Sequence, residues 1–254
     1  MTTGPGPITG SATNAEAWNR VAARLAAAAG PVDGVIRYGE DIATELELRL
    51  LGPLAGKRVL ELGCGTGHTA VALVRQGAKA IAIDPSEQLV THALRLAEQS
   101  DARVEIRVGD LADLAFLRAE SIDLALSAAA LGEVEDLDRV LRQVHRVLKP
   151  NAAFVCTVPH PFALCVERDG GGDGPLPLGR LVVTRAYLEE GPVDVQRHGE
   201  TFRIQRRAIS SMFSAFARAG FAVDQLLELA PGASADPGPG LPTTLLWRAR
   251  RLGL

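Results

Sequence analysis

The chain has 254 residues, of which 47% are hydrophobic, and a formal net charge of −3 at pH 7. This length and apolar content predict one sizeable α/β core rather than two domains. The charge argues against nucleic acid as the main partner, because phosphate contacts need clustered Lys and Arg.

Compartment is indicated by the start of the chain and by its cysteines. The sequence MTTGPGP has neither a basic nor an apolar signal region, and no apolar run approaches about 18 residues. We therefore expect a cytoplasmic protein with no membrane span. Cys64, Cys156 and Cys165 are too few and too scattered for a disulfide framework or a zinc site, so we expect reduced thiols and no metal.

The N-terminal fifth predicts a helical cover over residues 14–52. Residues 1–13 are rich in Gly, Pro and Thr, which predicts disorder. Residues 14–29 have apolar side chains at helical spacing and end at Gly30-Pro31, which predicts an amphipathic lid helix with Trp18 in its core-facing stripe. Residues 39–51, closed by Gly52-Pro53, predict a second helix.

A buried strand over residues 57–62 then runs into three alternating glycines, Gly63, Gly65 and Gly67. Such a turn lets backbone touch a ligand. The spacing differs from the dinucleotide pattern G-x-G-x-x-G, and Glu61 would repel a pyrophosphate but suit a cation. The alternative is an ordinary strand, turn and helix without a ligand.

Two further strands also end in acids. Residues 79–83 run into Asp84-Pro85-Ser86 and a helix over residues 87–99. Asp84 stands where a doubly wound fold places the acid that holds a ribose, although Asp84 and Ser86 could simply cap the helix. Residues 103–108 end at Gly109-Asp110-Leu111.

This succession resembles the class I S-adenosylmethionine-dependent methyltransferases, whose motif I reads acid-x-Gly-x-Gly-x-Gly. The resemblance implies that Asp84 binds the ribose of S-adenosylmethionine, that Asp110 meets the adenine amino group and that Leu111 packs on the ring. Tyr38-Gly39 resembles a lid tyrosine that reaches the cofactor carboxylate. The residues expected at the cofactor are Tyr38, Glu61, Gly63, Cys64, Gly65, Gly67, Asp84, Pro85, Leu89, Asp110, Leu111 and Ser127.

The remaining elements predict a Rossmann-like, doubly wound sheet. Strands over residues 122–127 and 152–158 flank an amphipathic helix over 135–148, and Asn151 stands in a turn that favours the left-handed region. A helix over 207–219 precedes strands over 221–229 and 243–250, which must pair antiparallel. The resemblance implies a single domain over residues 14–254 and a seven-stranded, mostly parallel sheet of order 3-2-1-4-5-7-6 with its last strand antiparallel. Residues 53–158 would form the cofactor-binding core, 159–206 a variable substrate-side insertion and 207–254 the C-terminal part.

The predicted chemistry is in-line methyl transfer to a small-molecule acceptor, for which proximity and orientation can suffice. His160, held between two prolines after the fifth strand, is a tentative base, although a loop histidine that shapes the pocket or faces solvent is the more ordinary interpretation. In the insertion, Leu181–Val183 and Thr201–Ile204 could pair as a hairpin, and the glycine-rich residues 170–174 could form an acceptor roof or a mobile loop. No Asn-Pro-Pro-Tyr-like motif follows Ser127, which favours a small molecule.

Two other functions stay open. Because no base is obvious, the chain could be a catalytically silent S-adenosylmethionine-binding partner or regulatory module. A nicotinamide-dependent dehydrogenase is less favoured, because Glu61 and the alternate glycines do not suit a pyrophosphate. The sequence leaves open the acceptor, the atom that is methylated and the oligomeric state.

Overall fold

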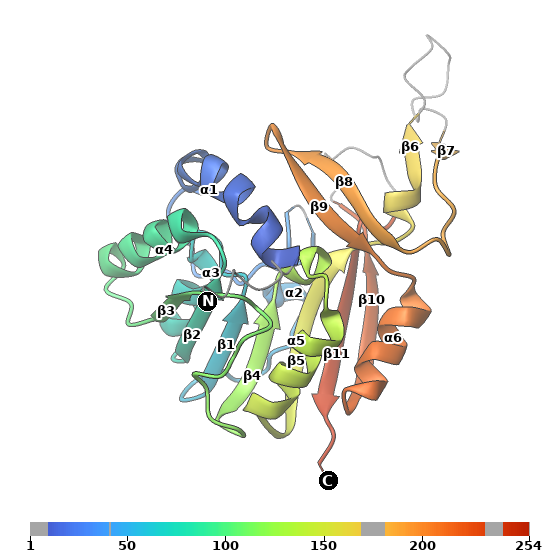
Figure 1. Cartoon of the computed structure of the whole chain (residues 1–254). Helices are drawn as coiled ribbons and strands as arrows, with labels where there is room; N and C mark the ends of the chain where they lie inside the picture. Colours follow the sequence, from blue (N-terminus) through green and yellow to red (C-terminus); the bar gives the residue numbers. More distant parts are fainter. Residues whose placement is uncertain (1–9, 41, 169–180, 232–240, 254) are drawn as a thin grey trace, which may run out of the picture.

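A computed structural model describes residues 10–40, 42–168, 181–231 and 241–253. Its central sheet has seven strands in the order β10–β11–β5–β4–β1–β2–β3 (Figure 1). If these seven strands are numbered by their order in the chain and read from β3 to β10, their order is 3-2-1-4-5-7-6, as predicted. The last strand pairs antiparallel with both of its neighbours, β10 and β5, whereas β5, β4, β1, β2 and β3 pair parallel with one another. The strands are β1 (Arg58–Leu62), β2 (Lys79–Asp84), β3 (Glu105–Val108), β4 (Ile122–Ser127), β5 (Leu148–Pro159), β10 (Phe221–Leu229) and β11 (Thr244–Arg251).

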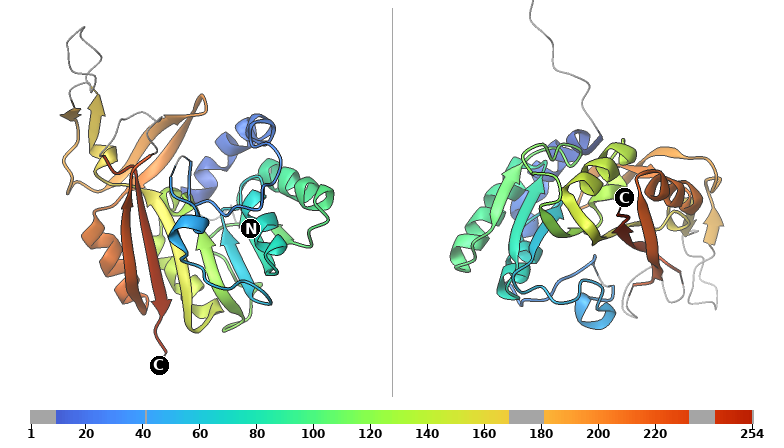
Figure 2. Two further views of the ribbon diagram at one scale, coloured as in Figure 1. Left: turned by 180° about the vertical axis from the view of Figure 1, so that it is seen from behind. Right: turned by 90° about the horizontal axis from the view of Figure 1, so that it is seen from below.

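Helices cover both faces of this sheet, because its central strands are apolar on both sides. On one face α5 (Leu137–Val147) and α6 (Ile209–Arg218) pack into the larger core cluster. On the other face α3 (His68–Arg75) packs with the N-terminal segment, and α4 (Glu87–Gln99) lies beside α3. The view from below in Figure 2 shows the short helix α2 (Glu45–Leu48) and α6 on opposite sides of the sheet.

The first helix, α1 (Gly10–Ala28), lies across the end of the sheet and packs on α4 and β9 (Figure 1). It is the predicted lid helix. The expected disordered segment lies outside the described residues as far as residue 9, and from Gly10 the chain is already helical. The helix thus begins about one turn earlier than predicted, because Ala is a strong helix former and Ser is favoured near helix N-termini.

The predicted helix over residues 39–51 is wrong. Only α2 (Glu45–Leu48) forms, with a capping box between Thr44 and Glu47 and a left-handed residue, Arg49, at its end. Its continuation is blocked because the Glu45 carboxylate accepts the backbone amides of Leu50 and Leu51, at 2.8 and 2.9 Å. Those amides are therefore not donated to the preceding turn, as a longer helix would require.

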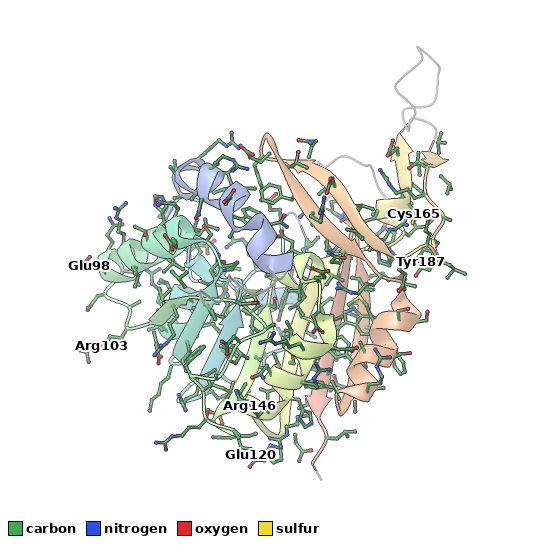
Figure 3. All side chains as sticks on the ribbon, viewed as in Figure 1. Glu98, Arg103, Glu120, Arg146, Cys165 and Tyr187 are labelled. Carbon is green, nitrogen blue, oxygen red and sulfur yellow. The ribbon has the colours of Figure 1, made fainter. Side chains whose placement is uncertain are left out.

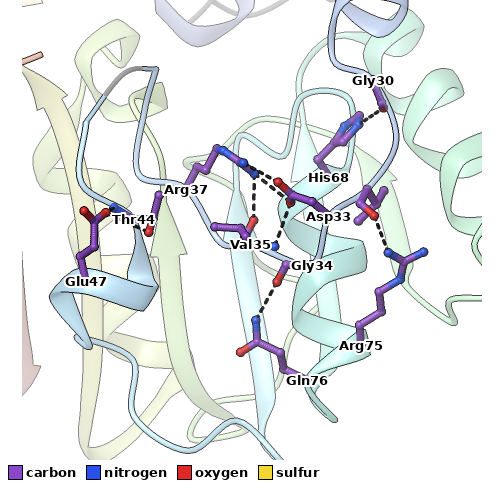
Figure 4. Close-up of polar contacts among 11 residues, drawn as sticks. Gly30, Asp33, Gly34, Val35, Arg37, Thr44, Glu47, His68, Arg75 and Gln76 are labelled. Carbon is purple, nitrogen blue, oxygen red and sulfur yellow. Dashed lines mark hydrogen bonds and ion pairs between the residues drawn. The ribbon is translucent and has the colours of Figure 1, made fainter. Parts of the chain in front are cut away.

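The segment between α1 and α2 is fixed to α3 by side chains (Figure 4). His68 Nε2 contacts the Gly30 carbonyl at 3.0 Å, Arg75 donates to Val32 O at 2.6 Å and Gln76 donates to Gly34 O at 3.0 Å. The lid helix is consequently attached at its C-terminal end to the helix that follows the glycine turn.

The described part of residues 159–206 forms two small antiparallel ladders in place of the predicted one. β6 (Val166–Arg168) pairs with β7 (Leu181–Val183), and β8 (Gly191–Arg197) pairs with β9 (Glu200–Arg206). The predicted pairing of Leu181–Val183 with Thr201–Ile204 is therefore wrong. The cause is the two-residue turn at His198 and Gly199, both with positive φ, which closes β8 onto β9. Residues 170–174 lie outside the described residues.

The hairpin β8–β9 and α1 form a roof over the carboxyl ends of the parallel strands. In Figure 3, Cys165 and Tyr187 lie near this end, whereas Glu120 and Arg146 lie at the opposite end of the sheet. The three cysteines are free and buried. Asn151 has φ 62°, which confirms the expected left-handed turn. No helix in the described part of the chain is long and apolar enough to cross a bilayer.

Candidate cofactor and acceptor site

A cavity of about 870 Å³ lies between the carboxyl ends of the strands and the roof. Its floor includes Gly63, Gly65 and Asp84, and its roof includes Trp18 of α1 and Arg197 of β8. This volume is within the range of small-molecule sites. One continuous cavity thus reaches from the glycine turn to the lid helix.

The three glycines of the turn all have positive φ, but they serve different purposes. A Cβ on Gly63 would lie 2.2 Å from the Cβ of Ala130, and one on Gly67 would lie 2.7 Å from that of Ala93. Both positions are closed by packing. A Cβ on Gly65 would meet no atom within 4 Å, so Gly65 leaves an open cradle on the cavity side.

Asp84, at the end of β2, connects this turn to the neighbouring strand. Its Oδ2 accepts the backbone amide of Gly65 and its Oδ1 accepts that of Ser86, both at 2.9 Å. Burial raises the pKa of Asp84 to about 6, against the lowering effect of the two amides. Ser86 caps α4 by accepting the Leu89 amide. The capping role thus belongs to Ser86, while Asp84 faces the cavity.

Glu61 is buried two residues before the turn, and its Oε2 has no hydrogen-bond partner in the described part of the chain. Burial, together with the nearby charge of Asp84, raises its pKa well above the ordinary value. A buried, unpartnered carboxylate is costly unless it meets a cation or a donor. Glu61 is not among the residues that line the cavity. Its unpartnered carboxylate, buried before the open side of Gly65, fits a ligand that carries an ammonium group.

The other predicted cofactor residues fall into two groups. Pro85, Leu89 and Leu111 line the cavity. The second group supports the turn and strand ends without being among the lining residues: Cys64 is buried behind the turn, Gly67 caps α3, Asp110 accepts the Ala112 amide at 2.9 Å, and Ser127 donates to Leu62 O at 2.9 Å.

Tyr38 lines the cavity, but its hydroxyl is directed elsewhere. The hydroxyl donates to Glu45 Oε2 at 2.5 Å, and burial together with this bond raises the tyrosine pKa above its ordinary value. A tyrosine has one hydroxyl hydrogen. In this structure it is given to Glu45, so it is not available to the cofactor carboxylate that the sequence suggested.

His160, the tentative base, lies in a different setting. It is buried, its Nε2 is 2.9 Å from Glu228 Oε1, and its Nδ1 accepts the Phe162 amide at 3.2 Å. Both ring nitrogens are therefore engaged, and His160 is not among the residues that line the cavity. This geometry connects β5 to β10 and leaves no nitrogen free to take a proton.

Glu133, which was not among the residues predicted from the sequence, is a buried acidic residue that lines the cavity. It lies on η1 (Ala130–Glu133), the 3₁₀ turn after β4, and accepts hydrogen bonds from Asn14 and Trp18. The available signal was a glutamate flanked by Gly132 and Val134 in an otherwise apolar run over 128–134. A charge in such a run is more often buried for a purpose than solvated.

The sheet order, the glycine turn and the strand-end acids are those of the class I S-adenosylmethionine-dependent methyltransferases, whose cofactor is S-adenosylmethionine. The methyltransferase domain family matches residues 60–156. A solved S-adenosylmethionine-dependent methyltransferase from Mesorhizobium loti is 29% identical, with a TM-score of 0.66, over 80% of this chain and 95% of that one. This assignment leaves the nicotinamide-dependent dehydrogenase without support.

Two curated relatives carry named activities. Magnesium-protoporphyrin O-methyltransferase from Rhodobacter capsulatus is 36% identical over 58% of this chain and 64% of its own length. Ubiquinone biosynthesis O-methyltransferase from Xanthomonas oryzae pv. oryzae is 37% identical over 44% of this chain and 49% of its own length. The chain therefore spans about half to two thirds of these relatives.

Proposed function

We propose that the protein transfers the methyl group of S-adenosylmethionine to an oxygen of a small organic molecule. The observation that carries the proposal is the continuous cavity of about 870 Å³ that joins the glycine turn to the roof formed by α1 and the β8–β9 hairpin. Trp18 and Leu25 contribute apolar surface to this cavity. A flat or open face would suit a macromolecular acceptor better.

Cofactor binding is assigned to the residues of the turn and the neighbouring strand ends. Gly65 supplies open backbone surface, Asp84 accepts from the ribose hydroxyls, and Glu61 compensates the ammonium charge. When bound, S-adenosylmethionine supplies a methyl group on a positively charged sulfur, which is already an activated leaving group. The chain's part is to align the acceptor and to exclude water, effects that can contribute roughly 7 to 11 kcal/mol.

Oxygen is the proposed acceptor atom because two relatives with overlapping core sequence are named O-methyltransferases. Both names denote reactions on small molecules. The similarity covers the cofactor core of this chain rather than its whole length. The roof, which would contact the acceptor, therefore has to be tested on this protein itself.

The test uses methyl-labelled S-adenosylmethionine and a cell extract separated into low-molecular-weight and macromolecular fractions. We expect label in an organic small molecule together with formation of S-adenosylhomocysteine, and no transfer by Asp84→Ala. Label in protein or nucleic acid would contradict the proposal. Tight binding of S-adenosylhomocysteine without transfer to any fraction would favour the silent, S-adenosylmethionine-binding module instead.

A further inference from the structure

One carboxylate oxygen of Glu133 accepts hydrogen bonds from the lid helix, and the other has no described donor. Its Oε2 accepts from Asn14 Nδ2 at 2.8 Å and from Trp18 Nε1 at 2.9 Å. No described group donates to Oε1. Because Oε1 is absent from the fully buried side-chain atoms without a partner, it retains some exposed surface. Because Glu133 is 8% exposed and lines the cavity, this oxygen faces the cavity.

The position of Glu133 relative to the glycine turn is fixed by η1. The first residue of η1, Ala130, is the one whose Cβ closes the space over Gly63. Along a 3₁₀ helix each residue advances about 2 Å, so Glu133 lies only about 6 Å further along the axis. Its carboxylate therefore stands between the cofactor half of the cavity and the roof.

The carboxylate is also held rigidly. Asn14 donates to Arg203 O at 2.9 Å and accepts the Arg203 amide at 2.9 Å, which ties it to β9. Trp18 packs on Phe202 of the same strand, with ring centroids 4.3 Å apart. The lid helix, the hairpin and η1 thus hold Glu133 from three sides, which is the preorganisation that a group in contact with a reacting atom needs.

The surroundings of Glu133 favour uptake of a proton. Burial raises its pKa, while the hydrogen bonds from Trp18 and Asn14 and the charge of Arg197 oppose this shift. The other charged or titratable groups that line the same cavity are Arg37, Tyr38, Glu40, Asp84 and His198, and the charge of Asp84 also raises the pKa of Glu133. A carboxylate with a raised pKa is a stronger base than an exposed one.

Resting on the proposed function, we propose that Glu133 Oε1 accepts the hydrogen bond of a phenolic or enolic hydroxyl on the acceptor and takes its proton. The acceptor O–H bond breaks and its proton goes to Oε1. The oxygen lone pair forms the new O–CH₃ bond, and the electron pair of the broken S–CH₃ bond stays on sulfur. Product release returns the proton from Glu133 to water.

A phenol or enol suits this base better than an aliphatic alcohol does. A phenolic hydroxyl has a pKa of about 10, as in tyrosine, whereas an alcohol is far less acidic. The aromatic and apolar side chains of the roof, Trp18 and Leu25, would pack against a planar ring. The acceptor class is therefore an aromatic or conjugated hydroxyl compound.

The variant Glu133→Gln tests this assignment without changing the shape of the site. Asn14 and Trp18 both donate to the Oε2 position, so the amide oxygen must occupy it. The amide nitrogen then replaces Oε1, and an acceptor facing the cavity becomes a donor. Glu135→Gln is the matched control, because Glu135 is exposed and is not among the lining residues.

Binding is measured by calorimetry with saturating S-adenosylhomocysteine. The ligands are 4-nitrophenol, catechol and 4-hydroxybenzoate, each beside its methyl ether. We expect the wild-type protein and Glu135→Gln to bind at least one phenol about tenfold more tightly than its ether, as a hydrogen bond to a charged group implies. Glu133→Gln should lose this preference and keep its affinity for S-adenosylhomocysteine within about twofold.

Two results of this phenol and ether comparison would contradict the proposed role of Glu133. The proposed role of Glu133 is overturned if the wild-type protein prefers no phenol over its ether, or if the preference survives in Glu133→Gln. For a phenol that is methylated, Glu133→Gln should lower kcat by about 100-fold or more and remove the acid limb of its pH profile. Failure of the wild-type protein to bind S-adenosylhomocysteine would instead contradict the proposed function.

Discussion

The backbone amide of Gly65 donates to Asp84 Oδ2 at 2.9 Å, and this bond joins the glycine turn after β1 to the end of β2. The same carboxylate also accepts the Ser86 amide, at the start of α4. One buried side chain therefore positions both backbone segments that face the cofactor half of the cavity. Its ionisation should be measurable in the stability of the protein.

Asp84 should make the ligand-free protein less stable as pH rises. Burial raises its folded pKa to about 6 from 3.8, so the folded state holds the proton more tightly than the unfolded state. Its contribution is fully present below about pH 4 and is lost as pH rises through about 6, by roughly 3 kcal/mol. Urea unfolding of the wild-type protein and Asp84→Asn should show this difference between about pH 4 and pH 7.5.

Asp113→Asn is the control for that series, because Asp113 is exposed and should show no such pH dependence relative to wild type. A difference between the wild-type protein and Asp84→Asn that stays constant with pH, or that changes in the opposite direction, would show that Asp84 is not the buried acid described here.

Glu61→Gln should separate stability from cofactor affinity. The carboxylate is buried beside Asp84 without a partner for Oε2, so a neutral amide should raise the unfolding free energy at neutral pH. The same change removes the carboxylate that we propose compensates the cofactor's ammonium, and affinity for S-adenosylhomocysteine should fall at least tenfold, roughly the value of one charged hydrogen bond. Calorimetry and thermal unfolding measure the two effects.

The exposed Glu98 at the outer end of α4 provides the matched control, Glu98→Gln, which should change neither quantity (Figure 3). If Glu61→Gln destabilised the protein at neutral pH, or bound S-adenosylhomocysteine as well as the wild type does, Glu61 would not be a cofactor residue.

Gly65→Ala should damage binding more than folding. Gly65 has φ 53° and open space at the Cβ position, so alanine costs about 1 to 2 kcal/mol of backbone strain without a clash. The new methyl group would occupy the cradle and should abolish detectable binding of S-adenosylhomocysteine. Gly52→Ala has a similar φ, 65°, and equally open space, but Gly52 does not line the cavity.

The two variants should therefore lose similar stability in denaturant unfolding, and only Gly65→Ala should lose the ligand. Equal affinity in both variants would show that nothing binds at the cradle.

The sheet and the glycine turn could be predicted because their determinants are local. The alternating glycines, the apolar runs before them and the acids at strand ends each follow directly from residue order. The antiparallel last strand followed from two strands without a helix between them. These features were confirmed in the order and direction of the seven strands.

The errors arose where distant side chains decide local structure. The helix over 39–51 has suitable propensity, but the Glu45 carboxylate takes the amides that would have continued it. In the insertion, the alternation of apolar residues does not indicate which strands pair with each other. The turn at His198 and Gly199 decides this, because it brings β8 and β9 together as a hairpin. Glu133 was missed because its partners, Asn14 and Trp18, are more than a hundred residues away in the chain.

His160→Gln should affect stability rather than chemistry. His160 connects the end of β5 to Glu228 on β10 and accepts the Phe162 amide, so its loss should cost about 1 kcal/mol of unfolding free energy. The acid limb of the methyl-transfer pH profile should stay where it is in the wild type. A hundredfold fall in kcat with a displaced acid limb would make His160 the base, as the sequence suggested.

Calorimetric titration of S-adenosylhomocysteine tests the central claim, that the glycine turn and Asp84 form a sulfonium-cofactor site. We predict one-to-one binding with micromolar affinity, equivalent to about 8 kcal/mol, to the wild-type protein. Asp84→Ala, with folding checked by circular dichroism, should give no binding heat. The claim would be contradicted if the wild-type protein showed neither binding heat nor a thermal shift, or if folded Asp84→Ala bound equally well.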